Sequence, residues 1–193
     1  ADFFELAPLM CLDALERDLT APLDPGAPLD APPVVSIVPL LENPERALVG
    51  GDYRAAAPYA RQASEADPKS AEAHRLLGDA ALLGGQGAEA DREFTAAIVL
   101  EPGNTKAVFG LATIAEQQKK WNTAASLYRR VLDLDPTNVA AARGLGRSMT
   151  ELGDKSAARM AFGRAIENDP AAAESRNDFG VFLFRSDELD RSI

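Results

Sequence analysis

Apolar residues recur at steps of three and four through most of the second half of this chain, which is the spacing of helices that each bury one face. The first clear stretch covers residues 71–83 and the next covers residues 88–100. The sequence GGQG at residues 84–87 separates them and is typical of a turn. The pattern therefore predicts a pair of helices, and the same pattern returns further along the chain.

The pair of helices belongs to a repeat with a period of 34 residues, set by Pro68, Pro102, Pro136 and Pro170. A fixed period of this size indicates a stack of structural repeats. Other columns follow the same period: the small residues Gly78, Ala112, Gly146 and Gly180, the alanines Ala90, Ala124 and Ala158, and the aromatic residues Phe94, Tyr128 and Phe162. The small residues predict the places where paired helices come closest together. The aromatic residues predict the side chains that fill the space between successive helix pairs.

Polar residues mark the helix boundaries of each repeat. Ser70, Asn104 and Asn138 stand directly before the first helix of their repeats, where a side-chain oxygen can accept an unpaired backbone N–H. The periodic prolines follow the second helix, which a proline cannot extend. Both signals support the same division into helix pairs.

These columns resemble the tetratricopeptide repeat (TPR) family. The resemblance implies an all-α, right-handed superhelical solenoid. Three complete repeats are expected at residues 71–104, 105–138 and 139–172, with a degenerate repeat at about 44–70 and a partial one at 173–193. In the degenerate repeat, Asn43 and Pro44 predict the start of a helix, and Pro58 predicts a kink in the next.

Residues 1–43 differ from the repeats in composition. They hold eight acidic residues and one arginine, and the stretch from 20 to 39 is rich in proline. The opening ADFFELAPLMCLDALERDL predicts an amphipathic helix. Three interpretations stay open: the helix packs on the solenoid, it lies in the solenoid's groove, or it binds a partner or is foreign to the repeat protein.

Composition excludes several functions. The formal charge is −10 without a basic stripe, which argues against nucleic acid as a partner. Cys11 and His74 are each the only residue of their type, so the usual zinc ligand set cannot be assembled, and His74 is expected to be a packing residue. No apolar run is long enough for a transmembrane helix. We expect no enzyme activity, catalytic residue, cofactor or metal.

The TPR resemblance implies that the first helices of the repeats line a concave binding groove. The residues expected there are Arg75, Asp79, Leu82, Leu83, Lys106, Phe109, Thr113, Arg143, Arg147 and Phe184. This mixture of apolar and cationic side chains predicts a protein or peptide partner with apolar anchors and some acidic residues. Alternatively, the leucines merely seal a turn, and the two arginines at 143 and 147 pair with Glu151 or Glu174.

The predicted function is a non-catalytic scaffold that binds a peptide or helix of a partner protein. The Lys and Asn pair with which some TPR co-chaperones hold a carboxylate is missing from the groove positions. Two alternatives remain. One is an envelope factor for bacterial pilus or secretion assembly, and the other is a module that self-associates through the apolar layer of its partial last repeat. The compartment stays open between the bacterial cytoplasm and the periplasmic face of the envelope.

Overall fold

The computed structural model describes residues 38–50 and 52–191, so the amphipathic helix expected near the N-terminus lies outside the described residues. The described residues belong to one compact unit. The described helices are α2 (Val38–Val49), α3 (Tyr53–Ala66), α4 (Ala71–Leu83), α5 (Gly87–Leu100), α6 (Thr105–Gln117), α7 (Trp121–Leu134), α8 (Val139–Glu151), α9 (Lys155–Asn168) and α10 (Ala173–Arg191). The expected all-α fold is confirmed.

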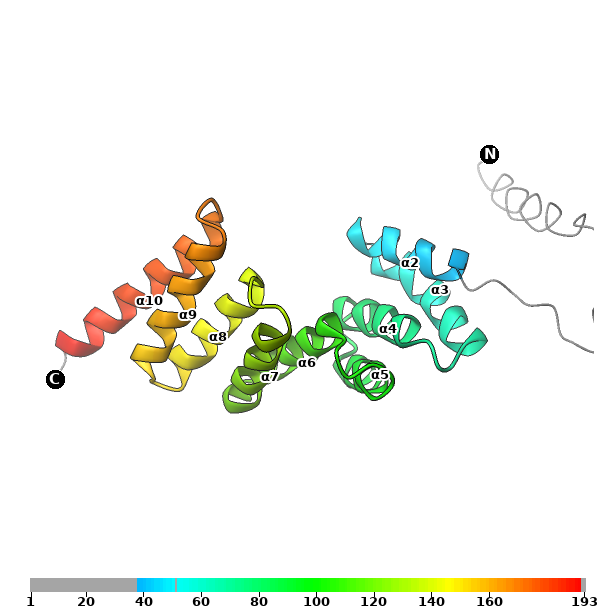
Figure 1. Cartoon of the computed structure of the whole chain (residues 1–193), viewed down its shortest axis with the longest axis horizontal. Helices are drawn as coiled ribbons and strands as arrows, with labels where there is room; N and C mark the ends of the chain where they lie inside the picture. The colour runs from blue at the N-terminus through cyan, green and yellow to red at the C-terminus, as the bar shows by residue number, and fades with distance from the viewer. Residues whose placement is uncertain (1–37, 51, 192–193) are drawn as a thin grey trace, which may run out of the picture. The chain divides into compact units, whose positions relative to one another are not determined.

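The helices follow one another as antiparallel pairs, α2 with α3 and so on to α8 with α9, before α10 (Figure 1). Each pair also contacts the next, and the first helices α2, α4, α6, α8 and α10 contact one another in series. This is the TPR-like arrangement that the 34-residue period predicts. Among the described helices, none combines the length and apolar character needed to cross a lipid bilayer.

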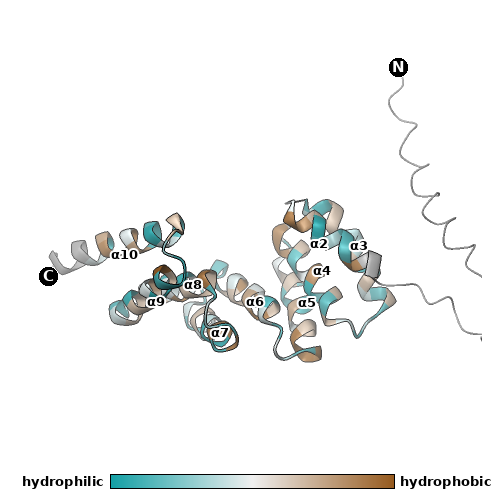
Figure 2. Ribbon diagram, turned by 45° about the horizontal axis from the view of Figure 1, so that its top comes forward, coloured by the Kyte–Doolittle hydropathy of each residue, from teal (hydrophilic) through white to brown (hydrophobic). Residues whose placement is uncertain are grey.

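The aromatic column fills the space between the helix pairs, as expected. Phe94, Tyr128 and Phe162 are almost fully buried. A Cβ atom added at Gly78 or Gly110 would lie within 2.8 Å of the Phe94 ring, so the absence of a side chain makes room for it. Along the helices, apolar and polar residues alternate so that each helix carries both kinds of surface (Figure 2).

The helix starts are also confirmed where side-chain caps were predicted. Ser70 Oγ accepts a hydrogen bond from the Ala73 amide at 3.2 Å, and Asn104 and Asn138 do the same for α6 and α8. These bonds satisfy amides that have no partner within the helix.

The degenerate first repeat differs from the expectation. Helix α2 begins at Val38 rather than at Asn43, and Pro44 lies inside it, while α3 runs through Pro58. Burial explains the longer α2, because Leu41 and Leu48 pack against a cluster around Leu76. That contact supports a helix despite the backbone hydrogen bond that an internal proline removes.

Candidate partner-binding groove

A groove of about 430 Å³ opens along the first helices of the N-terminal repeats. Its walls come from α2, α4 and α6 and from the start of α8. The residues that line it are Leu48, Asp79, Leu82, Leu83, Thr105, Lys106, Phe109, Gly110, Thr113, Asn138 and Ala140. A hollow of this size, walled mainly by carbon, suits the side chains of a peptide or helix.

The apolar wall of the groove is only partly covered. Leu83, at the end of α4, is 55% exposed. Phe109 is half-buried and packs edge-on against Tyr128 with a ring-centroid distance of 5.7 Å. The contact with the Tyr128 ring holds the Phe109 ring in place. Leu83 is the most exposed large apolar side chain of the lining. Burial of such a surface by a partner is favourable.

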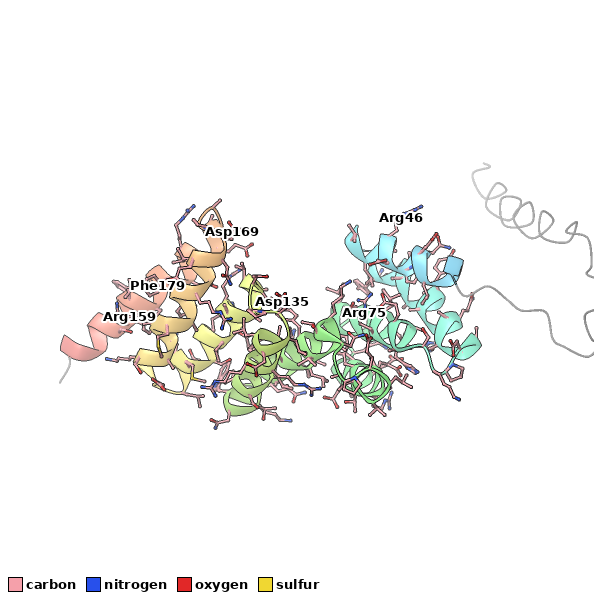
Figure 3. The ribbon with its side chains drawn as sticks, in the orientation of Figure 1. Arg46, Arg75, Asp135, Arg159, Asp169 and Phe179 are labelled. Carbon is pink, nitrogen blue, oxygen red and sulfur yellow. The ribbon has the colours of Figure 1, made fainter. Side chains whose placement is uncertain are left out.

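A buried arginine and two carboxylates of α4 lie on the polar side of the groove, and of these three groups Asp79 lines it. Arg75, labelled in Figure 3, is 4% exposed and lies on α4 with both of its partners. Its Nε donates to Glu72 Oε2 at 2.7 Å, Nη2 donates to Glu72 Oε1, and Nη1 donates to Asp79 Oδ2. Burial alone would lower the pKa of Arg75, but the hydrogen bond with Glu72 and the charge of Asp79 raise it, so the guanidinium stays charged.

Asp79 is the partner that faces the groove. Burial raises its pKa to about 6, because desolvation and the nearby Glu72 charge outweigh the attraction of Arg75 and Lys106. Across the groove, Lys106 of α6 is 68% exposed and lies 3.9 Å from Glu45 of α2. Asp79 of α4 and Lys106 of α6 therefore border the apolar hollow, and Glu45 of α2 lies beside Lys106.

A second cluster of charges lies on α6, α8 and α10. Arg143 pairs with Glu174 and with Asp178, the latter at 2.8 Å, and Arg147 reaches Asp178 at 3.2 Å. Arg147 also donates two hydrogen bonds to Glu116, at 2.6 and 3.1 Å. Each arginine thus has two carboxylate partners inside the chain.

Glu116 ties this second cluster to the core. Its Oε2 accepts the hydroxyl of the buried Tyr128 at 2.5 Å. Burial alone would raise the pKa of Glu116, but hydrogen bonds from Arg147 and Tyr128 hold the pKa below its usual range. Burial and the bond to Glu116 likewise raise the pKa of Tyr128. The carboxylate is therefore ionised and fully engaged with its neighbours.

The ten residues predicted from the sequence divide between these places. Asp79, Leu82, Leu83, Lys106, Phe109 and Thr113 line the groove. Arg75 lies behind Asp79, and Arg147 borders a smaller hollow of about 190 Å³ next to α10. Arg143 is bound to the acids of α10, and Phe184 stands 66% exposed on that helix.

The expectation of acidic residues in the partner rested on Arg143 and Arg147. The alternative, pairing within the chain, describes them better: Arg143 does bind Glu174, although Arg147 binds Glu116 and Asp178 rather than Glu151. Glu151 instead pairs with Arg185 at 3.1 Å. Paired arginines add little uncompensated positive charge for a ligand.

Five residues that line the groove lie outside the predicted set: Leu48, Thr105, Gly110, Asn138 and Ala140. Leu48 lies on α2, whose start was misplaced, and Ala140 is the second residue of α8. The TPR resemblance also implies that the second position of each repeat faces the groove, and Ala140 stands at that position, so the sequence held a usable signal for it. Leu48 had none, because it belongs to the degenerate repeat.

No group of three or more His, Cys, Asp or Glu side chains suited to a metal ion occurs in the described part of the chain. His74 does more than pack, since its Nδ1 lies 2.8 Å from Glu93 of α5 and its Nε2 lies 3.2 Å from the Pro68 carbonyl oxygen. These contacts join α4 to its neighbours.

The family model of the protein kinase G tetratricopeptide repeat matches residues 5–172, most of the chain. The chain belongs to this family. The match takes in part of the N-terminal segment ahead of α2 as well as the helices from α2 to α9. A repeat region of this kind is a non-catalytic, protein-binding scaffold.

Curated relatives share parts of the repeat array. The chain is 31% identical over 94 residues to the CTR9 homologue of Arabidopsis thaliana, covering 47% of this chain and 9% of that protein. It is 28% identical over 120 residues to superkiller complex protein 3 of Mus musculus, covering 62% of this chain and 8% of the relative. The chain therefore spans less than a tenth of the length of these relatives.

Solved structures match the fold closely. MamA from Desulfovibrio magneticus superimposes with a TM-score of 0.70 at 19% identity, covering 82% of this chain and 90% of that one. YrrB, described as a TPR protein with an unusual peptide-binding site, superimposes with a TM-score of 0.64 at 19% identity, covering 79% of this chain and 78% of YrrB. TTC0263 of Thermus thermophilus superimposes with a TM-score of 0.69 at 16% identity, covering 80% of this chain and 85% of TTC0263. At these identities the likeness establishes the TPR fold.

Proposed function

We propose that the chain binds an extended or helical segment of a partner protein in the groove along α2, α4, α6 and the start of α8. The observation that carries this proposal is the 430 Å³ apolar hollow with the half-exposed Leu83 at its wall. First helices of repeat arrays form extended binding surfaces of this kind. The peptide-binding site named for YrrB is consistent with the same use of the fold.

Apolar side chains of the partner would supply most of the affinity. Removing about one leucine-sized contact costs roughly 1.5 kcal/mol when the contact is well buried, or about tenfold in Kd. Leu83 is the best residue for a test, because it is exposed and its replacement disturbs little of the core. Phe109 is less suitable, since its ring packs on Tyr128.

We expect Leu83→Gln to weaken groove-dependent binding by about tenfold. The probe is a phage library that displays random 16-residue peptides, selected on the immobilised full chain. Enriched peptides are then synthesised, and their Kd is measured by isothermal titration calorimetry. Leu83→Gln removes an apolar side chain without adding charge.

The matched control is Val99→Gln on α5, whose valine is 76% exposed and lies outside the groove lining. It should leave Kd unchanged. Equal binding by all three proteins would overturn the groove as the binding site.

We also propose that the module works with a protein kinase, since the matched family is named after the repeats of one. Kinases captured from an extract of the source organism by the full chain would be labelled with an ATP-derived acyl-phosphate probe and identified by mass spectrometry. Capture should fall with Leu83→Gln and persist with Val99→Gln. Absence of any kinase from the captured set would count against this second role.

A further inference from the structure

Five charged groups lie in or directly beside the groove, and their charges do not balance. Glu45, Glu72 and Asp79 contribute three negative charges, whereas Arg75 and Lys106 contribute two positive ones. Arg75 pairs with both acids of α4, and Lys106 of α6 approaches Glu45 of α2. Lys106 also attracts Asp79, so the five groups act on one another. Asp79 and Lys106, which line the groove, balance each other, and the three groups beside them leave the set of five with one surplus negative charge.

Asp79 is the acidic side chain of this set that lines the hollow. This side chain lines the groove, is 30% exposed, and accepts one hydrogen bond from the described residues, at Oδ2 from Arg75. Arg75 gives its other two donors to Glu72. Asp79 therefore retains acceptor capacity at the surface that a ligand would touch.

We propose that the segment held in this groove is basic as well as apolar: leucine- or phenylalanine-like side chains rest against Leu82, Leu83 and Phe109, and a lysine or arginine of the partner reaches Asp79. This deepens the proposed function and rests on it. A cation at this point would complete the neutralisation of the α2–α4–α6 charges and make a charge-assisted hydrogen bond.

Charge also selects among the other occupants. An acidic ligand would meet the surplus negative charge of the five groups, and Lys106, the cation of the lining, already lies beside Glu45 and attracts Asp79. The arginines expected to receive an acid, Arg143 and Arg147, are paired with Glu116, Glu174 and Asp178. Residues 1–37 of the chain hold seven acidic residues and one arginine, so in charge they are a poor match. A basic segment of a partner protein is the occupant that the groove favours.

The protonation of Asp79 gives the proposal a pH signature. Burial raises the pKa of Asp79 to about 6, opposed by Arg75 and Lys106 and assisted by Glu72. Only the ionised carboxylate attracts a cation, so affinity should be full above pH 7 and fall as the pH drops through about 6. With a free-state pKa near 6, the loss from pH 7.5 to pH 5 is roughly tenfold.

The test starts from the random 16-residue phage library, selected on the full chain. Peptides that also bind a version carrying Leu83→Gln and Ala140→Gln are removed; both positions are exposed, so this version is expected to fold. Peptides that remain should combine Leu or Phe with Lys or Arg at a fixed spacing. Enrichment of Asp or Glu, or no preference for basic residues, would overturn the basic-ligand proposal.

Synthetic versions of one enriched peptide then isolate the contact, measured by fluorescence polarisation. Lys→Gln in the peptide should weaken binding to the full chain about tenfold and have little effect with Asp79→Asn. The pH dependence should disappear in the same variant. Asp91→Asn on α5, an exposed acid outside the groove lining, is the matched control and should behave like the parent.

The two proposals fail in distinguishable ways. A selection that yields no peptide sensitive to the Leu83 and Ala140 changes overturns groove binding itself. If the affinity of groove-dependent peptides does not change with the peptide lysine, with Asp79→Asn or with pH, groove binding stands. That result overturns only the proposal that the partner segment is basic. Because the peptide substitution leaves the protein untouched, a folding defect of Asp79→Asn cannot produce the second result.

Discussion

Gly144 shows how a single residue sets the spacing between repeats. A Cβ atom at this position would lie 2.3 Å from Cζ of Tyr128, far inside van der Waals contact. The ring cannot move freely, because its hydroxyl donates to Glu116 at 2.5 Å and its face contacts Phe109. The missing side chain of Gly144 thus lets α8 approach α7. Tyr128 of α7 in turn packs against Phe109 of α6, which lines the groove.

We therefore expect Gly144→Ala to lower the free energy of unfolding by about 1–3 kcal/mol, despite the better helix propensity of alanine. Chemical denaturation followed by circular dichroism measures the change. Gly163→Ala, in the same repeat, is the matched control: nothing lies within 4 Å of its added Cβ, so this variant should gain up to about 1 kcal/mol. Equal effects at both positions would contradict the packing role of Gly144.

At the scale of the element, helix starts differ in how they are held. Asn138 caps α8 through Oδ1, which accepts the Ala141 amide at 2.9 Å, and its Nδ2 donates to Asp135. Lys120 occupies the same cap position of α7 without a side-chain cap bond. Since α8 supplies one end of the groove, its cap also fixes part of the binding surface.

Asn138→Ala should cost about 1 kcal/mol of stability, the usual value for a lost cap. Thermal unfolding followed by circular dichroism provides the measurement. Lys120→Ala changes a cap residue that makes no cap bond and should stay within about 0.5 kcal/mol of the parent. The cap interpretation is wrong if the two variants lose the same stability.

At the scale of the molecule, each helix pair contacts mainly its neighbours in the series. Phe162 illustrates this: its ring lies 5.6 Å from Phe182 and 6.1 Å from Phe179, measured between ring centroids, and these contacts belong to the last layer. The groove is formed by the earlier helices α2, α4 and α6 with the start of α8. In a solenoid, stability is close to a sum of repeat and interface terms, so damage at one end spreads little.

Phe162→Ala should therefore loosen α8 to α10 selectively, at a cost of about 3–5 kcal/mol for that region. Amide hydrogen exchange read by mass spectrometry should increase in α9 and α10 and stay near the parent level in α3 and α4. A uniform rise across all described helices would show instead that residues 36–193 unfold as one unit. The groove peptides should keep most of their affinity in the first case.

Much of the fold was predictable because the sequence signals that specify it are local and recur in each repeat. The 34-residue period, the caps at Ser70, Asn104 and Asn138, and the aromatic column depend on short-range rules that apply once per repeat. Where the sequence departs from the repeat, prediction failed: Pro44 was interpreted as a helix start, yet burial of Leu41 and Leu48 extends α2 across it.

The sequence by itself determined the helix pairs and their order, because these follow from periodicity. The face of each first helix expected to turn to the groove came from the TPR resemblance. Only the tertiary structure decided the electrostatics of that face. Arg143 and Arg147 find Glu116, Glu174 and Asp178 on other helices, about one repeat away in sequence. The physical reason is that ion pairing and desolvation depend on distances between helices, which no spacing within one helix specifies.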